Sequence, residues 1–327
     1  MISSKKKIRI DSISGYGDIM LVSILAIGAK KIFPDSNIYI HLNARKEFCQ
    51  ALIGDLFYQL GSEKIKDYNI YYSIINNRTY ATYNEIENDP IINQSIENQN
   101  KDFGENWQER LNSVLRKDIE EYSHNIYIGD LIKRRFLIDF NPYELKPRLM
   151  KNFKHKSNAK NYITINTCCQ NSKKSKMWPE EYWNQLINYI KYKNKYIQIY
   201  HLGAKHDYTI KNKFINYEYF NNINIFDSLN LMYNSMLHIG TEGTFIHAAS
   251  VLGNLAYCIN GCCGGFYMHP VKNIKYFVNK DCGCKHFPCG KYSYDRAFYR
   301  KCGNGEHLCM AENKPETIIN YMEKNFK

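Results

Sequence analysis

Apolar positions at the start of the chain follow the patterns of a strand, a helix and a second strand. Ile8 and Ile10 alternate with polar residues between about 6 and 12, and an apolar stretch fills much of 18–32. Alternation returns over 37–42. A strand, a helix and a strand at this spacing form a βαβ unit, and such units build parallel sheets.

A second series of the same kind begins after residue 160. Strands are predicted at 162–166, 196–202, 236–240 and 255–260, and helices at 179–191, 244–251 and 315–325. The polar, basic stretch 141–161 carries two prolines and separates the two series. We therefore expect an α/β protein of two Rossmann-like domains, with parallel sheets facing a central cleft. The expected domains are 1–155 and 156–327.

The pattern is weaker between 75 and 124, where Asn, Glu and Lys are frequent. It predicts one amphipathic helix from Trp107 to Glu120 and then a strand over Asn125–Gly129. The remainder of this stretch is consistent with a mobile insertion.

Composition limits the class of partner. The 327 residues carry a formal charge of +12 and are 44% hydrophobic. This charge favours nucleic acid, an anionic membrane face or phosphorylated small molecules, although its scatter also fits an ordinary solvated surface. The chain shows neither a run of about 20 apolar residues nor a secretory signal, so we expect a cytoplasmic protein. Peripheral contact with the inner membrane is an alternative.

The first candidate site follows the opening strand and reads Gly15-Tyr16-Gly17-Asp18. In an open parallel sheet this edge lines the ligand crevice. Gly17 allows a close approach of the backbone to a ligand. Asp18 fits a general base, and it equally fits an ordinary N-cap residue.

The second candidate site combines Thr167, at the end of a predicted strand, with Lys176, just before the helix that begins near Pro179. A lysine beside a helix N-terminus can bind a diphosphate. The alternative is a plain helix entry, with Trp178 in the core and Lys176 in solvent.

The third candidate site is the strand-to-helix turn over 240–249. Glu242 could hold sugar or ribose hydroxyls, and the amides of Gly243 and Thr244 could face a phosphate. His247 fits a ligand contact and also a core histidine that fixes this turn.

Eleven cysteines in a chain without an export signal argue against a disulfide framework. A cluster of five is a candidate structural zinc or iron site, with His286 and His307 nearby. Its members are Cys282, Cys284, Cys289, Cys302 and Cys309. The spacing lacks paired Cys-x-x-Cys knuckles, so a reduced, metal-free hairpin remains the alternative.

Taken in order, these motifs resemble glycosyltransferase family 9, the ADP-heptose:lipopolysaccharide heptosyltransferases. Gly17–Leu21 is similar to the opening Gly-Asp-x-x-Leu of that family, and Lys176–Pro179 to its Lys-x-Trp-Pro signature. Glu242–His247 resembles its Asp-x-Gly-x-x-His, and Cys309-Met310 resembles the end of its Cys-rich tail.

The resemblance implies the GT-B fold and inverting sugar transfer from a nucleotide sugar, with an ADP-sugar favoured and no cofactor needed for transfer. It implies that Asp18 is the general base. The residues it implies for donor binding are Gly17, Thr167, Lys176, Glu242, Gly243, Thr244 and His247. The implied acceptor is a hydroxyl of a surface glycan, a lipopolysaccharide core, another lipid-linked sugar or a protein. The chain departs from the family where Glu242 replaces the usual Asp and Thr244 replaces the commonest Gly.

Two alternatives stay open beside this enzyme. One is a basic, metal-stapled nucleic-acid-binding protein, which would explain the charge and the cysteines and gives Asp18 no role. The other is a catalytically silent scaffold that still binds a nucleotide sugar. The enzyme hypothesis expects no nucleic-acid partner.

Overall fold

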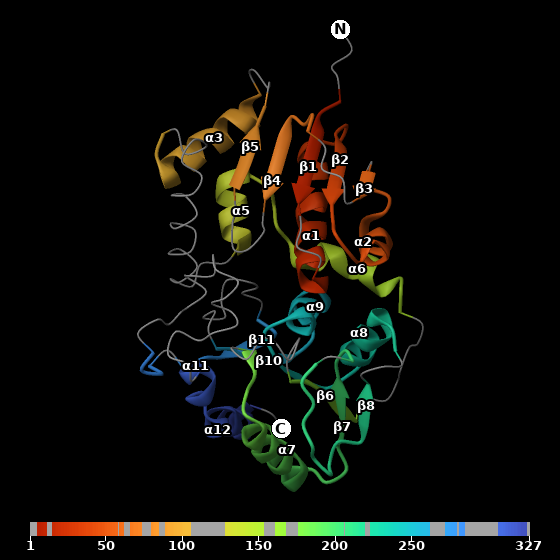
Figure 1. Cartoon of the computed structure of the whole chain (residues 1–327), viewed down its shortest axis with the longest axis vertical. Coiled ribbons are helices and arrows are strands. Elements are labelled where there is room, and N and C mark those ends of the chain that lie inside the picture. The colour runs from red at the N-terminus through yellow and green to blue at the C-terminus, as the bar shows by residue number, and fades with distance from the viewer. Residues whose placement is uncertain are drawn as a thin grey trace. The chain divides into compact units, whose positions relative to one another are not determined.

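The computed structural model describes most of the chain. The described residues are 5–11, 15–57, 59–61, 66–73, 80–84, 89–105, 128–153, 161–167, 176–205, 207–219, 223–261, 272–279, 281–284 and 307–325. The chain divides into two compact units, one formed mainly by Met1–Lys151 and the other mainly by residues from Asn152 onward (Figure 1). The boundary predicted at residue 155 falls outside the described residues. The domain limits and the central cleft stay predictions.

The first unit contains a twisted sheet built around the opening strand. Its described strands are β1 (Lys7–Asp11), β2 (Asn37–His41), β3 (Gln59–Gly61), β4 (Ile70–Ser73) and β5 (Tyr80–Tyr83). Their order is β3-β2-β1-β4-β5, and the pairings are parallel except that β5 runs antiparallel to β4. Because the chain proceeds from β1 to both sides of the sheet, β1 and β4 form a topological switch point.

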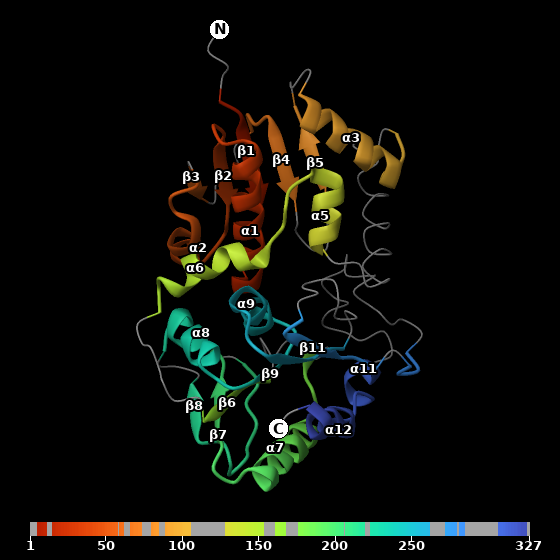
Figure 2. The ribbon, with the colours of Figure 1, turned by 180° about the vertical axis from the view of Figure 1, so that it is seen from behind.

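Helices cover the apolar face of this sheet. They are α1 (Tyr16–Ile32), α2 (Lys46–Ile53), α3 (Pro90–Phe103), α5 (Ile128–Phe136) and α6 (Lys146–Met150), with the 3-10 turn η1 (Pro142–Leu145) before α6. Figure 2 shows α1 lying along β1 and β2. Ile8 and Ile10 of β1 are fully buried, and Tyr72 of β4 packs on Phe136 of α5 with ring centroids 5.2 Å apart. The period-2 pattern of β1 thus marks the helix-covered side.

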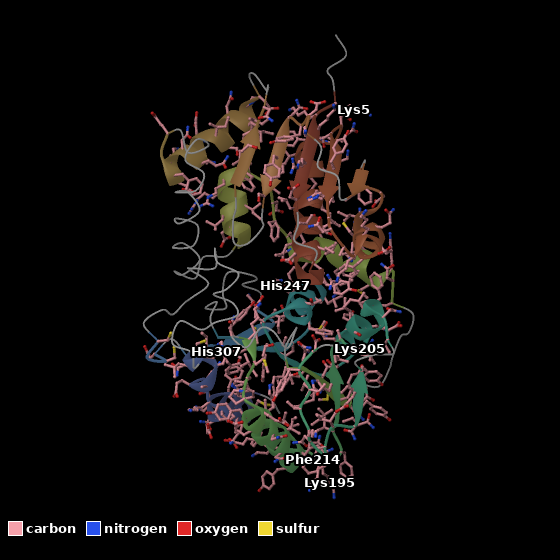
Figure 3. All side chains as sticks on the ribbon, viewed as in Figure 1. Lys5, Lys195, Lys205, Phe214, His247 and His307 are labelled. Carbon is pink, nitrogen blue, oxygen red and sulfur yellow. The ribbon has the colours of Figure 1, made fainter. Side chains whose placement is uncertain are left out.

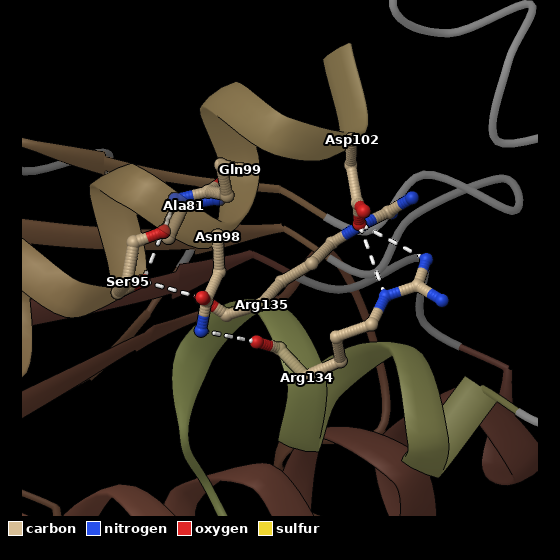
Figure 4. Close-up of polar contacts among 7 residues, drawn as sticks. All are labelled: Ala81, Ser95, Asn98, Gln99, Asp102, Arg134 and Arg135. Carbon is tan, nitrogen blue, oxygen red and sulfur yellow. Dashed lines mark hydrogen bonds and ion pairs between the residues drawn. The ribbon is translucent and has the colours of Figure 1, made fainter.

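Side chains of α3 satisfy the last carbonyls of α5 (Figure 4). Ser95 Oγ donates to the carbonyl of Arg135 at 2.5 Å, and Asn98 Nδ2 donates to that of Arg134 at 2.7 Å. Carbonyls at a helix C-terminus have no partner within the helix, so these bonds hold α5 against α3. Gln99 of the same helix binds β5, because its Oε1 accepts a hydrogen bond from the amide of Ala81 at 3.0 Å.

An arginine is buried beside these bonds. The Arg135 side chain is 0% exposed, and its Nε lies 2.9 Å from Asp102 Oδ2. Arg134 Nη2 lies 3.0 Å from the same oxygen. The Arg135 guanidinium also stacks over the ring of Phe103 at 4.2 Å. A buried charge is tolerated only when it is paired, so Asp102 is a main support of this corner.

The second unit contains a sheet whose described strands are all parallel. They are β6 (Tyr162–Asn166), β7 (Gln198–Leu202), β8 (Tyr217–Tyr219), β9 (His238–Thr241), β10 (Ala256–Ile259) and β11 (Ile274–Phe277). The order β11-β10-β9-β6-β7-β8 is that of the doubly wound Rossmann sheet. Figures 1 and 2 show helices on both sides of it. These helices are α7 (Glu180–Lys193), α8 (Ile225–Tyr233), α9 (Thr244–Leu252), α11 (Leu308–Ala311) and α12 (Pro315–Asn325).

These two sheets confirm the predicted α/β class and the Rossmann-like folds. The predicted strand over Asn125–Gly129 is wrong where it can be checked, because Ile128 and Gly129 begin α5. The predicted helix from Trp107 to Glu120 lies outside the described residues. The stretch 75–124 is not wholly an insertion without structure, since it holds β5 and α3. None of the described helices is long and apolar enough to cross a membrane.

We predict that Asp102→Ala lowers the free energy of unfolding by about 3 kcal/mol, because it leaves the Arg135 charge buried without its carboxylate. The matched control is Glu323→Ala, which breaks the surface pair with Lys193, where the side chains are 52% and 47% exposed. That change should cost less than about 1 kcal/mol. Urea unfolding followed by circular dichroism measures both, and equal losses in the two variants would refute the role assigned to Asp102.

Candidate functional site

The second sheet has its topological switch point between β6 and β9. These strands are neighbours, with Asn166 beside Gly240, although the chain leaves them toward opposite edges of the sheet. Ligands of open parallel sheets bind outside the carboxyl ends of the strands at such a point. Thr167 follows β6 and Glu242 follows β9, so two residues that the sequence predicts for donor binding lie at this edge.

Three of the predicted residues meet in one cluster there. The Lys176 ammonium forms an ion pair with the Glu242 carboxylate, and His247 Nε2 lies 3.8 Å from Glu242 Oε1. The exposed fractions of the Lys176, Glu242 and His247 side chains are 14%, 9% and 5%. His247 comes from the first turns of α9, where Figure 3 labels it. Lys176 is therefore not the solvent-exposed lysine of the alternative interpretation.

The cluster keeps Glu242 ionised. Burial raises the pKa of its carboxyl group, but the Lys176 charge and the neighbouring His247 outweigh burial and hold this pKa well below its usual range. A buried carboxylate in this state accepts hydrogen bonds and donates none. It can accept a hydrogen bond from a hydroxyl group of a ligand.

The positive end of α9 adjoins this carboxylate. The N-cap residue is Gly243, which offers no capping side chain, and α9 begins at Thr244. A helix N-terminus favours negative charge. The turn also needs Gly240, because a Cβ atom there would lie 2.8 Å from His238 Nε2 and 3.3 Å from the carbonyl oxygen of Asn166. This close packing brings β6 and β9 together.

Thr167 is positioned differently from the sequence expectation. Its hydroxyl donates to the carbonyl of Tyr208 and lies 3.1 Å from His201 Nε2, and the residue is fully buried. Thr241 Oγ1 in turn donates to the Thr167 carbonyl at 3.4 Å. The Thr167 side chain is thus engaged inside the unit, and a phosphate contact by this residue stays a prediction.

Trp178 of the Lys-x-Trp-Pro segment belongs to the core, as the structural alternative expected. It is fully buried and packs on Trp183 with ring centroids 5.1 Å apart. Its Nε1 donates to the carbonyl of Asn313 at 2.7 Å. The segment therefore anchors itself through Trp178 while it holds Lys176 at the cluster.

In the first unit, Asp18 lies at the start of α1. Gly15 is the N-cap residue, so Asp18 is not the N-cap of the alternative interpretation but the third residue of the helix. Its side chain reaches back over Gly15, where a Cβ atom would lie 2.4 Å from Asp18 Oδ2. Glycine at position 15 therefore leaves the space that this carboxylate occupies.

A polar group that the motif analysis missed lies at the carboxyl end of β1. Asp11 accepts two bonds from Arg9, at 2.9 Å from Nε and 2.7 Å from Nη2, and one from the Tyr71 hydroxyl at 3.4 Å. His41 Nδ1 lies 3.8 Å from Asp11 Oδ1. The polar positions that alternate with Ile8 and Ile10 were its signal in the sequence. This network fixes the carboxyl end of β1, seven positions before Asp18.

Three of the five clustered cysteines are described. Cys282 and Cys309 are buried, and Cys284 is half-buried. Cys289 and Cys302 lie outside the described residues. Within the described residues, no group of three or more His, Cys, Asp or Glu side chains is arranged to hold a metal ion. The metal site stays a prediction.

The sequence matches no family model and no curated protein. Solved structures nevertheless share its architecture. The iron-containing dodecameric glycosyltransferase TibC from enterotoxigenic E. coli superposes with a TM-score of 0.61 at 12% identity, over 99% of this chain and 77% of that one. The E. coli heptosyltransferase WaaC, with ADP-2-deoxy-2-fluoro heptose, gives 0.54 at 10% identity, over 98% and 99%.

A glycosyl transferase family 9 structure from Veillonella parvula gives a TM-score of 0.53 at 12% identity, over 98% of this chain and 96% of that one. At such identities the likeness concerns the fold. The chain is thus an α/β protein with the two Rossmann-like domains of the GT-B fold, as the motif resemblance implied. Its structural neighbours are glycosyltransferases of the heptosyltransferase type.

Two histidines of the second unit predict a pH dependence of stability. Burial lowers the pKa of His201 to about 3 and that of His238 to about 3, so both are neutral in the folded protein. In the unfolded chain they gain protons near pH 6.5. The stability they contribute is present above pH 6.5 and is lost as the pH falls toward 3, by up to about 1.4 kcal/mol per pH unit and histidine.

Urea unfolding between pH 7 and 5 should show this loss, and His238→Gln should reduce its slope. A slope unchanged in that variant would contradict the prediction. Lys193, whose side chain is 52% exposed, provides a control site, since Lys193→Gln should leave the slope near pH 6 as it is.

Proposed function

We propose that this protein is an inverting glycosyltransferase that moves a sugar from a nucleotide sugar to a hydroxyl group. The observation that supports this most is the cluster of Lys176, Glu242 and His247, beside the N-terminus of α9 at the switch point of a Rossmann sheet. A charged lysine, an ionised carboxylate and the positive end of a helix suit a ligand with both phosphates and hydroxyls.

In the proposed donor complex, Lys176 and the amides of Gly243 and Thr244 bind the diphosphate. Glu242 accepts a hydrogen bond from a hydroxyl group of the donor. Lys176 and the helix end stabilise the negative charge that develops on the leaving nucleotide. An ADP-sugar is favoured as donor, because the TibC structure was determined with ADP-D-β-D-heptose and that of WaaC with an ADP-linked fluoro-heptose. The transferred sugar is then a heptose or a related sugar.

In the proposed reaction, the Asp18 carboxylate takes the proton of the acceptor hydroxyl as the new bond forms. The acceptor oxygen attacks the anomeric carbon, and the bond from that carbon to the phosphate oxygen breaks. The nucleoside diphosphate leaves with the electron pair. A single displacement of this kind inverts the configuration and needs no redox cofactor.

For the acceptor, the formal charge of +12 favours an anionic partner. A lipopolysaccharide core or another anionic surface glycan carries such charge, and an acidic protein segment does too. Contact with such an acceptor at the inner membrane face would be peripheral.

We predict that ADP or ADP-heptose raises the melting temperature by several degrees, since a ligand that binds only the folded state stabilises it. UDP, GDP and CDP complete the panel as nucleotide controls. Asp18→Asn should keep this shift and lose transfer by at least about a hundredfold, because the general base is removed while the donor site is intact. Transfer is measured as release of ADP from ADP-heptose with a lipopolysaccharide core acceptor.

The outcomes separate the hypotheses. A melting shift without any ADP release in the wild type would favour the silent scaffold, and full activity of Asp18→Asn would remove this residue from the mechanism. No shift with any nucleotide, together with salt-sensitive binding to DNA or RNA, would favour the nucleic-acid-binding alternative.

We further propose a structural zinc or iron ion at the cysteine cluster. Thiolate ligands for a tetrahedral set would be drawn from the five clustered cysteines of the segment 282–309. TibC, which has the same fold, is described as iron-containing. The ion would stabilise the C-terminal segment and take no part in transfer.

We expect elemental analysis of the purified protein to find about one zinc or iron ion per chain. Cys309→Ser should lose the ion and lower the melting temperature. Cys49→Ala is the control, because Cys49 is a buried free thiol of the first unit. A wild type without metal, or a Cys309→Ser variant that retains it, would contradict this proposal.

A further inference from the structure

Asn260 directly follows β10, at the same sheet edge as the proposed donor site. The register pairs Ile259 of β10 with Thr241 of β9, so Asn260 comes level with Glu242 on the neighbouring strand. Adjacent strands are about 4.8 Å apart. The register therefore places Asn260 beside Glu242, the residue whose carboxylate we assign to the donor, on the neighbouring strand.

The backbone of Asn260 is fixed on both sides. Its amide donates to the carbonyl of Phe277 at 2.8 Å, and its carbonyl accepts from Asn313 Nδ2 at 3.3 Å. Asn313 Nδ2 also donates to the Phe277 carbonyl at 2.8 Å, while the Asn313 carbonyl accepts from Trp178. These bonds hold the backbone of the strand end in place.

The Nδ2 donor of Asn260 is nevertheless unsatisfied. The residue is 2% exposed, and Nδ2 is buried without a hydrogen-bond partner in the described structure. Asn166 makes the contrast, because it lies at the carboxyl end of β6 and its Nδ2 donates to the Leu202 carbonyl at 2.8 Å. A buried donor without a partner costs about 1–3 kcal/mol, and most buried polar groups avoid that cost. A hydrogen-bond acceptor on a ligand bound at this edge would remove that cost.

We propose that Asn260 is a further donor-binding residue, whose Nδ2 donates a hydrogen bond to a hydroxyl or phosphate oxygen of the nucleotide sugar. This inference rests on the proposed function. The chemistry complements Glu242, since a carboxylate only accepts hydrogen bonds and an amide nitrogen only donates them. Together they offer one acceptor and one donor to neighbouring oxygens of the ligand.

The test measures the dissociation constants of ADP and ADP-heptose by calorimetry, together with the melting temperature without ligand. Asn260→Ala should weaken binding about tenfold, the usual loss for one hydrogen bond of this kind. Asn260→Asp keeps the shape and replaces the donor with an acceptor, so it should weaken binding at least as much. Asn260→Ala should not lower the melting temperature, because Nδ2 has no partner to lose in the ligand-free protein. Asn260→Asp also buries a carboxylate, so its melting temperature should fall and it is compared by its dissociation constants alone.

Asn254→Ala is the matched control at the opposite end of β10. Asn254 Nδ2 donates to the carbonyl of Tyr233 at 2.9 Å and to that of Met232 at 3.3 Å. This variant should therefore lower the melting temperature and leave both dissociation constants unchanged. The two asparagines separate a ligand-binding amide from a structural one.

The two ligands locate the contact. Weaker binding of both assigns the Asn260 partner to the nucleoside diphosphate, and weaker binding of ADP-heptose alone assigns it to the sugar. Unchanged binding of both, or an Asn260→Ala variant that melts earlier or does not fold, would overturn the inference while the proposed function stands. A wild type that binds neither ligand would overturn both.

Discussion

The ion pair between Lys176 and Glu242 is the contact on which the candidate site depends. It joins two segments that are 66 positions apart in the chain, at a place where both side chains are nearly buried. Burying two charges costs desolvation energy, which is recovered only when their geometry and further hydrogen bonds are good. His247 lies 3.8 Å from the carboxylate, and the N-terminal end of α9 adds favourable charge for it. Loss of either partner would leave a buried charge at the switch point.

The Rossmann topology explains why chemistry gathers at these edges. In each unit the chain leaves two central strands toward opposite sides, so the residues after those strands meet without a covering connection. Close packing then makes glycine necessary at particular positions. Gly240 leaves room for His238 and Asn166 in the second sheet, and Gly15 leaves room for the Asp18 carboxylate in the first unit. The same edge that builds the fold thus presents the candidate functional groups.

The hydrophobic pattern of a segment predicts its secondary structure correctly where the element is stabilised by burial along its own length. The strand at Tyr162–Asn166 is buried at every position, and the helix Pro315–Asn325 has an apolar stripe, so both were predicted with the observed bounds. The α3 helix was missed because its supports are distant: Gln99 bonds β5, and Ser95 and Asn98 bond α5. Family motifs indicated Lys176 and Glu242, but the position of Asn260 follows only from strand pairing, which one sequence does not display.

The Lys-x-Trp-Pro segment shows how a core residue and a functional one depend on each other. Trp178 is buried, yet its Nε1 bond to Asn313 holds the residue that bonds the carbonyls of Asn260 and Phe277. Asn313 lies between the two C-terminal helices, directly after the segment that carries Cys309. One hydrogen-bond network therefore connects the Lys176 segment, the carboxyl ends of β10 and β11, and the cysteine-rich end of the chain. Because these bonds are buried, a change that loosens the C-terminal helices also weakens the hydrogen bonds that hold Asn260 at the proposed donor site.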